Sequence, residues 1–256
     1  MKRIFILALT VLSLCGSTVQ AKKPVRITVL SYNVQAAKRY PTEEYAKFIR
    51  QYNPDFVAFQ ELDLMTKRFP KKPDFLSDVA RMVGMTPVYA AAMAYSEGQY
   101  GIGLMTRLPV CGVQAFALPQ PEGSYEPRRA VTVEAQVKKG LTMRFTSTHL
   151  DLPSDTIRLQ QVTALTRWLS QDDTPSIICG DFNAKPESQA IHYMENTWQR
   201  VCDQLPTFPE TDPHSKIDYI FVRGKGTWKV VDYQRLLDVP LSDHCPILVT
   251  LEYTQE

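Results

Sequence analysis

Six segments of the chain place an acid, an amide or a histidine at the end or the start of an apolar run. Taken singly, such residues have structural explanations, because Asp and Asn also cap helices and form turns. Six of them in one layered α/β chain instead favour a site, because strand ends can converge at one rim. The residues in question are Asn33, Glu61, His149, Asp181, Asn183, Asp218, Asp243 and His244.

The donor types in these segments suit a hard divalent cation and the hydrolysis of a phosphoester. Carboxylate oxygens are ligands of Mg²⁺ and Mn²⁺, which also keep water and substrate phosphate in their coordination shells. Two histidines add groups that can transfer protons near neutral pH. The sequence therefore predicts a Mg²⁺ enzyme, with Mn²⁺ as the alternative ion, that directs in-line attack of water on phosphorus.

The elements that must position these residues are a few helices and many strands. Apolar periodicity predicts helices over 43–51, 74–83 and 188–194, and a fourth that begins after Ser154. The run of strands that follows the second helix is expected to be antiparallel and connected by hairpins. Such a mixture favours two packed sheets covered outside by helices. The expected strands are 25–34, 55–60, 87–94, 101–106, 110–118, 130–138, 141–149, 175–179, 217–222, 228–233 and 246–253.

The same segments, in this order, resemble the motifs of the endonuclease/exonuclease/phosphatase superfamily. The strongest matches are Gly180-Asp181-Phe182-Asn183 and Ser242-Asp243-His244-Cys245-Pro246, supported by Gln60-Glu61 and Ser147-Thr148-His149-Leu150. The resemblance spans Ile27 to Leu251. It implies the DNase I-like fold, a four-layered α/β/β/α sandwich of two mixed, mainly antiparallel sheets.

The resemblance implies a metal site and a group that activates water. Glu61 would be the principal metal ligand, with Asn33 and Asp243 beside it. His244, held and polarised by Asp218, would orient or deprotonate the attacking water.

The resemblance also implies groups that contact the reacting phosphate. Asp181 and Asn183 would position the nucleophile and bind a phosphate oxygen, and Asp181 is a second candidate for activating the water. His149 would stabilise the developing charge or protonate the leaving oxygen. Tyr100 and one of two adjacent arginines, with Arg129 preferred over Arg128, are further candidates for binding phosphate.

The first residues resemble a secretory signal. Lys2 and Arg3 precede an uncharged apolar run from 4 to 15, and small residues at 19–21 offer a cleavage site. The run is shorter than the roughly 20 residues that a membrane-spanning helix needs. We expect a signal peptide at 1–21, a single catalytic domain at 22–256, and export to the periplasm or the medium. Cys15, followed by Gly16, leaves a lipoprotein anchor as an alternative.

Charge and cysteine spacing limit the function classes. Residues 22–256 carry as many basic as acidic residues, and their only local basic cluster spans 67–72, which speaks against a nonspecific grip on long nucleic acid. Nuclease, inositol-phosphate phosphatase and sphingomyelinase-like lipid phosphodiesterase activities stay open, as does a non-catalytic secreted binding protein. We expect a monomer without a protein partner. The remaining cysteines, expected to be buried apolar residues, are Cys111, Cys179, Cys202 and Cys245.

Overall fold

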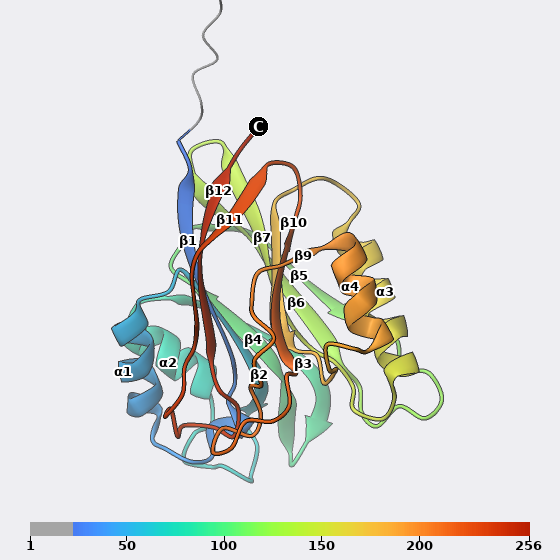
Figure 1. Ribbon diagram of the computed structural model, residues 1–256. Helices are drawn as coiled ribbons and strands as arrows, with labels where there is room; N and C mark the ends of the chain where they lie inside the picture. Colours follow the sequence, from blue (N-terminus) through green and yellow to red (C-terminus); the bar gives the residue numbers. More distant parts are fainter. Residues whose placement is uncertain (1–22) are drawn as a thin grey trace, which may run out of the picture.

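A computed structural model describes residues 23–256, which form two six-stranded sheets packed face to face (Figure 1). The expected signal peptide, including Cys15, lies outside the described residues. In spatial order the first sheet contains β11 (Thr227–Arg235), β12 (Ile247–Thr254), β1 (Val25–Asn33), β2 (Phe56–Leu64), β4 (Gly98–Thr106) and β3 (Thr86–Tyr95). The second sheet contains β5 (Val110–Ala117), β6 (Arg129–Lys138), β7 (Leu141–His149), β8 (Ser176–Asp181), β10 (Asp218–Arg223) and β9 (Gln199–Arg200).

Helices cover the outer faces of both sheets. A single turn of 3-10 helix, η1 (Gln35–Ala37), follows β1. The α-helices are α1 (Thr42–Tyr52) and α2 (Phe75–Val83) over the first sheet, and α3 (Asp155–Leu169) and α4 (Gln189–Thr197) over the second (Figure 1). Within each sheet one strand pair is parallel, β1 with β2 and β7 with β8, and the other pairs are antiparallel. The expected four-layered sandwich of mixed, mainly antiparallel sheets is confirmed.

Strand alternation divides the apolar core into layers. Along β1, Val29 faces the second sheet, whereas Leu30 packs under the helices of the first sheet. Between the sheets, the rings of Phe56 and Phe145 lie 4.4 Å apart. Each such fully buried side chain stabilises the fold by about 1.5–3 kcal/mol relative to its exposed state. Both faces of these strands are therefore mostly apolar, and the buried hydroxyls of Thr132 and Thr146, in the middle of β6 and β7, pair with each other at 2.7 Å.

The expected elements are found, with one error in how they connect. Ser154 caps α3 as predicted, its hydroxyl accepting from the backbone N–H of Ile157 at 3.2 Å. The run of hairpins is wrong between β4 and β5, because these strands belong to different sheets. Instead of a hairpin, the chain crosses over at Arg107, whose backbone N–H donates to the carbonyl of Asp55 at 3.3 Å. The very short β9 and η1 carry too few residues to show a period and were not expected.

The described cysteines are all unpaired, and their burial differs from one to the next. Cys179 and Cys245 are buried, as expected. Cys202 is half-buried, and Cys111 is exposed, so the expectation is wrong for Cys111. It lies on β5, one of the two edge strands of the second sheet, where one face meets solvent. As for membranes, residues 23–256 contain no helix with the length and apolar character that spanning would need.

Gly180 is the position where we expect the addition of a single methyl group to destabilise the fold most. Its φ of 152° is unfavourable for other residues, and a Cβ would stand 1.9 Å from the carbonyl oxygen of Thr148. We expect Gly180→Ala to lower the free energy of unfolding by about 3 kcal/mol or more, through backbone strain and overpacking. Gly123→Ala, also at positive φ but with nothing within 4 Å, should cost only about 1 kcal/mol. Urea unfolding of both variants tests this, and equal losses would contradict it.

Candidate active site

The inward-facing rows of several strands end in polar side chains at one end of the sandwich. In β8, Ile177 and Cys179 belong to the core between the sheets, so alternation turns Asp181 inward as well. Asp181 is also the register partner of the last residue of β7 and of the first residue of β10. The four inward residues that the strands bring to this end are Asn33, His149, Asp181 and Asp218.

Two further predicted residues reach the site through left-handed backbone. Glu61 has φ 58° and lies where the register of β2 shifts between Phe59 and Leu62. Asn183, just after β8, has φ 46°. Such conformations cost about 1–3 kcal/mol each and are concentrated at functional sites. The bulge in β2 directs Glu61 toward Asn33, whose Nδ2 donates to Glu61 Oε1 at 2.9 Å.

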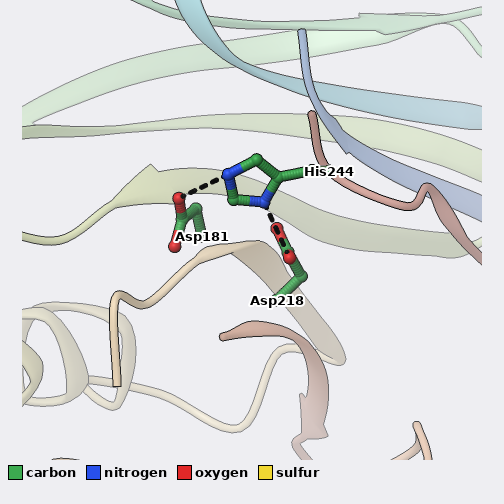
Figure 2. Close-up of side chains that lie close together, drawn as sticks. All are labelled: Asp181, Asp218 and His244. Atoms are coloured by element: carbon green, nitrogen blue, oxygen red, sulfur yellow. Dashed lines mark hydrogen bonds and ion pairs between the residues drawn. The ribbon is translucent and has the colours of Figure 1, made fainter. Parts of the chain in front are cut away.

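His244 lies between two buried carboxylates (Figure 2). Its Nδ1 donates to Asp218 Oδ2 at 3.0 Å, and its Nε2 lies 3.7 Å from Asp181 Oδ2. Asp218 is held in turn by the hydroxyl of Thr207, which donates to the same oxygen at 2.6 Å. Burial alone would lower the pKa of His244, but the nearby carboxylates, Asp218 first and then Asp181 and Asp243, together outweigh burial and raise that pKa to about 10. Burial also raises the pKa of the Asp181 carboxyl, against the influence of His244. Asp181, His244 and Asp218 therefore form one proton-sharing group, in which the protonation of each residue depends on the others.

The second histidine of the site, His149, is held in its neutral form, in contrast to His244. Arg128 Nη1 lies 2.9 Å from His149 Nδ1. Because a guanidinium can only donate, His149 Nδ1 accepts a hydrogen bond from Arg128, and the neutral ring carries its proton on Nε2. Nε2 lies 3.5 Å from Asp181 Oδ2, which can accept its proton, and 3.0 Å from Asn183 Nδ2, which is itself a donor and cannot. Burial, reinforced by Arg128 and by His244, holds the pKa of His149 well below its usual value. A neutral His149 is therefore a hydrogen-bond donor to the site.

We expect Arg128→Met to raise the pKa of His149. Removing the guanidinium takes away a positive charge that disfavours the imidazolium and leaves its partner Glu126, 2.7 Å from Arg128, without that cation. In ¹⁵N-detected NMR the wild type should show His149 as the neutral Nε2–H form at pH 6.5, whereas the variant should titrate at higher pH. Arg129→Met is the matched control and should leave the titration unchanged. A pKa of His149 that is the same in both variants would contradict the assignment.

Two of the three expected metal ligands, Glu61 and Asn33, are in contact beside this group, and Gln35 links Asn33 to the third, Asp243. Asn33 Nδ2 donates both to Glu61 and, at 3.1 Å, to Asp181 Oδ2, so two carboxylates flank one amide. Gln35 donates from its backbone to Asn33 Oδ1 and from its side chain to Asp243. Within residues 23–256 no lysine or arginine pairs with Glu61 or Asp243. Hard oxygen donors without a balancing cation fit a divalent ion.

A second cluster with metal-ligating atoms overlaps the proton-sharing group. One ligand atom each from Asp181, Asp218 and His244 lies within 4.8 Å of the others. Both nitrogens of His244 already face carboxylates, an arrangement that suits a proton better than an ion. We therefore retain Glu61, Asn33 and Asp243 as the predicted ligand set.

The two remaining candidates for binding phosphate, Tyr100 and Arg129, differ in their relation to the site. Tyr100 lines a cleft beside Glu61, and burial raises its pKa, so its hydroxyl keeps its proton. Arg129 is half-buried and has no side-chain hydrogen bond to a site residue in the described chain, whereas its neighbour Arg128 does. Gln35 and Thr207 were missed, because no local pattern marks either residue. Their roles follow only from the partners that the fold brings to them.

Comparison with known proteins identifies the family of the chain and its fold. The family model described as "Endonuclease/Exonuclease/phosphatase family" matches residues 30–244. A member of that family from Bacteroides vulgatus has a structure with a TM-score of 0.74 at 19% identity, covering 89% of this chain and 99% of its own. No curated protein matches the sequence.

Two further solved structures share the fold. ANGEL2, a 2′,3′-cyclic phosphatase, has a TM-score of 0.72 at 14% identity, covering 93% of this chain and 99% of that one. The human Nocturnin catalytic domain with bound sulfate has a TM-score of 0.70 at 18% identity, covering 92% and 97%. With the family match spanning most of its length, this chain belongs to the endonuclease/exonuclease/phosphatase family of phosphoester hydrolases.

Proposed function

We propose that the protein is an exported, Mg²⁺-dependent phosphodiesterase that directs water in line onto phosphorus. The observation that carries the proposal is one continuous set of contacts, Glu61–Asn33–Asp181–His244–Asp218, which joins the expected metal ligands to the proton-sharing group. Export rests on the N-terminal sequence alone.

Each residue of this set has a defined task. Asp218 fixes the ring of His244 through Nδ1, which leaves Nε2 and Asp181 Oδ2 facing the same space. A water molecule held there would be oriented by both groups, and Asp181 would take its proton, because the raised pKa of His244 leaves that ring already protonated. His149 presents Nε2–H beside Asn183, so together they would donate to the charge that develops on phosphate oxygens.

Glu61, with Asn33 and Asp243, would hold the Mg²⁺ ion. A bound Mg²⁺ supplies Lewis-acid stabilisation of negative charge on the phosphate. Asn33 ties the metal ligand to the proton-sharing group, because its amide touches the carboxylates of both Glu61 and Asp181. Movement of Asn33 would therefore disturb both parts of the site together.

Hydrolysis of a substrate panel tests the proposal. The panel contains plasmid DNA, RNA, sphingomyelin, inositol phosphates, simple alkyl phosphodiesters and a nucleoside phosphodiester, each with Mg²⁺, Mn²⁺ or EDTA. We expect turnover of a diester that EDTA abolishes and Mg²⁺ or Mn²⁺ restores. Turnover that persists in EDTA would contradict metal dependence. Tight ligand binding without turnover of any member would instead support a binding protein on this fold.

A further inference from the structure

A small cleft with aromatic walls opens directly beside Glu61. Its volume is about 190 Å³, below the roughly 300–1,000 Å³ of sites for drug-sized ligands, so it has room for one ring rather than a large molecule. Two tyrosines in its wall are exposed, Tyr95 by 40% and Tyr125 by 74%. The residues around it are Glu61, Arg68, Met93, Tyr95, Tyr100, Tyr125 and Glu126.

The planar side chains on one side of the cleft, Arg68 and Tyr95, are held in place by their neighbours. The guanidinium of Arg68 lies 4.6 Å from the ring centre of Tyr95. Asp63, which is buried, accepts from Arg68 Nε and Nη2, each at 2.5 Å. On the other side of the cleft, the backbone N–H of Tyr125 donates to Asp151 Oδ2 at 2.8 Å. The Arg68–Tyr95 wall is therefore organised before a ligand arrives, which reduces the entropy cost of binding, whereas at Tyr125 it is the backbone that is anchored.

The charges in the cleft argue against a second phosphate. Glu61 and Glu126 contribute two carboxylates to its lining. The positive charge of Arg68, the one basic residue among the lining residues, is already balanced by Asp63. Glu126 is balanced in turn by Arg128 at 2.7 Å, so a highly phosphorylated ligand would meet the Glu61 carboxylate and no unpaired cation among the lining residues. An uncharged ring with N–H donors would instead find aromatic and guanidinium faces for stacking and a carboxylate acceptor at Glu126.

Long nucleic acid is disfavoured by the same part of the chain. Three members of the basic cluster at 67–72 already have partners within the chain, one of them in an exposed ion pair. Lys67 pairs with Glu97 at 2.5 Å, Arg68 pairs with Asp63, and Lys72 donates to the carbonyls of Ala37 and Tyr40. An extended phosphate backbone needs free cations along its path, which this cluster offers poorly.

We propose that this cleft is a base-binding subsite, so that the substrate is a single-nucleoside phosphodiester whose planar base lies between Tyr125 and the Arg68–Tyr95 pair. The proposal rests on the proposed hydrolase function, because the base must lie next to the phosphate that Glu61 and the metal would hold. Tyr95 and Tyr125 act as specificity residues, which contact the base and do not contact the reacting phosphate.

The test compares two substrates that differ only in the base. One is the methyl phosphodiester of adenosine 5′-monophosphate, and the other carries a methoxy group in place of adenine. We expect kcat/KM to favour the adenosine diester by about tenfold or more, the usual effect of stacking one base. Tyr125→Ala and Tyr95→Ala should remove this preference by lowering kcat/KM for the adenosine diester toward the value for the base-free diester. Tyr40→Ala, at an exposed tyrosine outside the cleft, is the matched control and should keep the preference.

Binding measurements separate failure of the subsite from failure of the activity. Calorimetry with non-hydrolysable phosphonates of both compounds, in the presence of Mg²⁺, needs no turnover. Equal affinities and equal kcat/KM values, or a preference that survives both tyrosine substitutions, would overturn the subsite. Tighter binding of an inositol phosphonate than of the adenosine phosphonate would also overturn it in favour of a polyol. Absence of hydrolysis with a base preference in binding would instead contradict only the proposed function.

Discussion

Replacing His244 by alanine will lower kcat for phosphodiester hydrolysis by about 10³- to 10⁴-fold. The ring is the group through which Asp218 acts on Asp181, with contacts of 3.0 and 3.7 Å. Without it, water loses both an orienting partner and the group with which Asp181 shares the proton. Steady-state kinetics at saturating Mg²⁺ measures the effect. His192→Ala, at an exposed histidine on α4, should keep wild-type activity.

The dependence of Asp218 on His244 gives a sharper version of this experiment. Asp218 touches His244 and Thr207 but acts on water only through the ring. We expect Asp218→Asn to lower kcat less than His244→Ala does, and the double variant to be no slower than His244→Ala alone, because residues that act as a unit are not additive. Additive losses would show that Asp218 acts separately. Should His244→Ala fail to fold, His244→Asn keeps a side chain that can donate to Asp218.

Replacing Glu61 by glutamine will weaken Mg²⁺ binding by about 100-fold or more. Loss of a group that merely supports a ligand typically costs 10- to 100-fold in metal affinity, and Glu61 is expected to be a direct ligand. The side chain keeps its shape and can still meet the Asn33 amide, so the change removes mainly the negative charge. Calorimetric titration with Mg²⁺ and the Mg²⁺ dependence of kcat measure the effect.

Two observations would decide how to interpret the Glu61 result. High Mg²⁺ should restore part of the activity of Glu61→Gln, because the lost interaction is with the ion. Glu44→Gln, at an exposed glutamate on α1, should bind Mg²⁺ as the wild type does. An unchanged Mg²⁺ dissociation constant for Glu61→Gln would move the metal away from Glu61 and toward the Asp181–Asp218–His244 cluster.

Strand ends were the part of the site that local sequence could predict. Asn33, His149 and Asp181 each follow an inward apolar row, so the period of the strand already sets the direction of the side chain. The two sheets and their helices were predictable for the same reason, because periodicity and caps are local signals. The exchange of sheets between β4 and β5 was not, because a hairpin and a crossover can follow the same apolar pattern.

The amino-acid sequence by itself determined which chemical groups stand at the strand ends and, through its motifs, the family of the chain. Only the tertiary structure decided how those groups are charged and partnered. It selected Arg128 over its neighbour as the partner of His149, and it brought Thr207 to Asp218. It also assembled the cleft from Arg68, Tyr95 and Tyr125, which lie on three separate segments. Contacts of this kind join residues far apart in the chain, and their hydrogen bonds and pKa shifts depend on burial and distance, which arise only when the two sheets pack together.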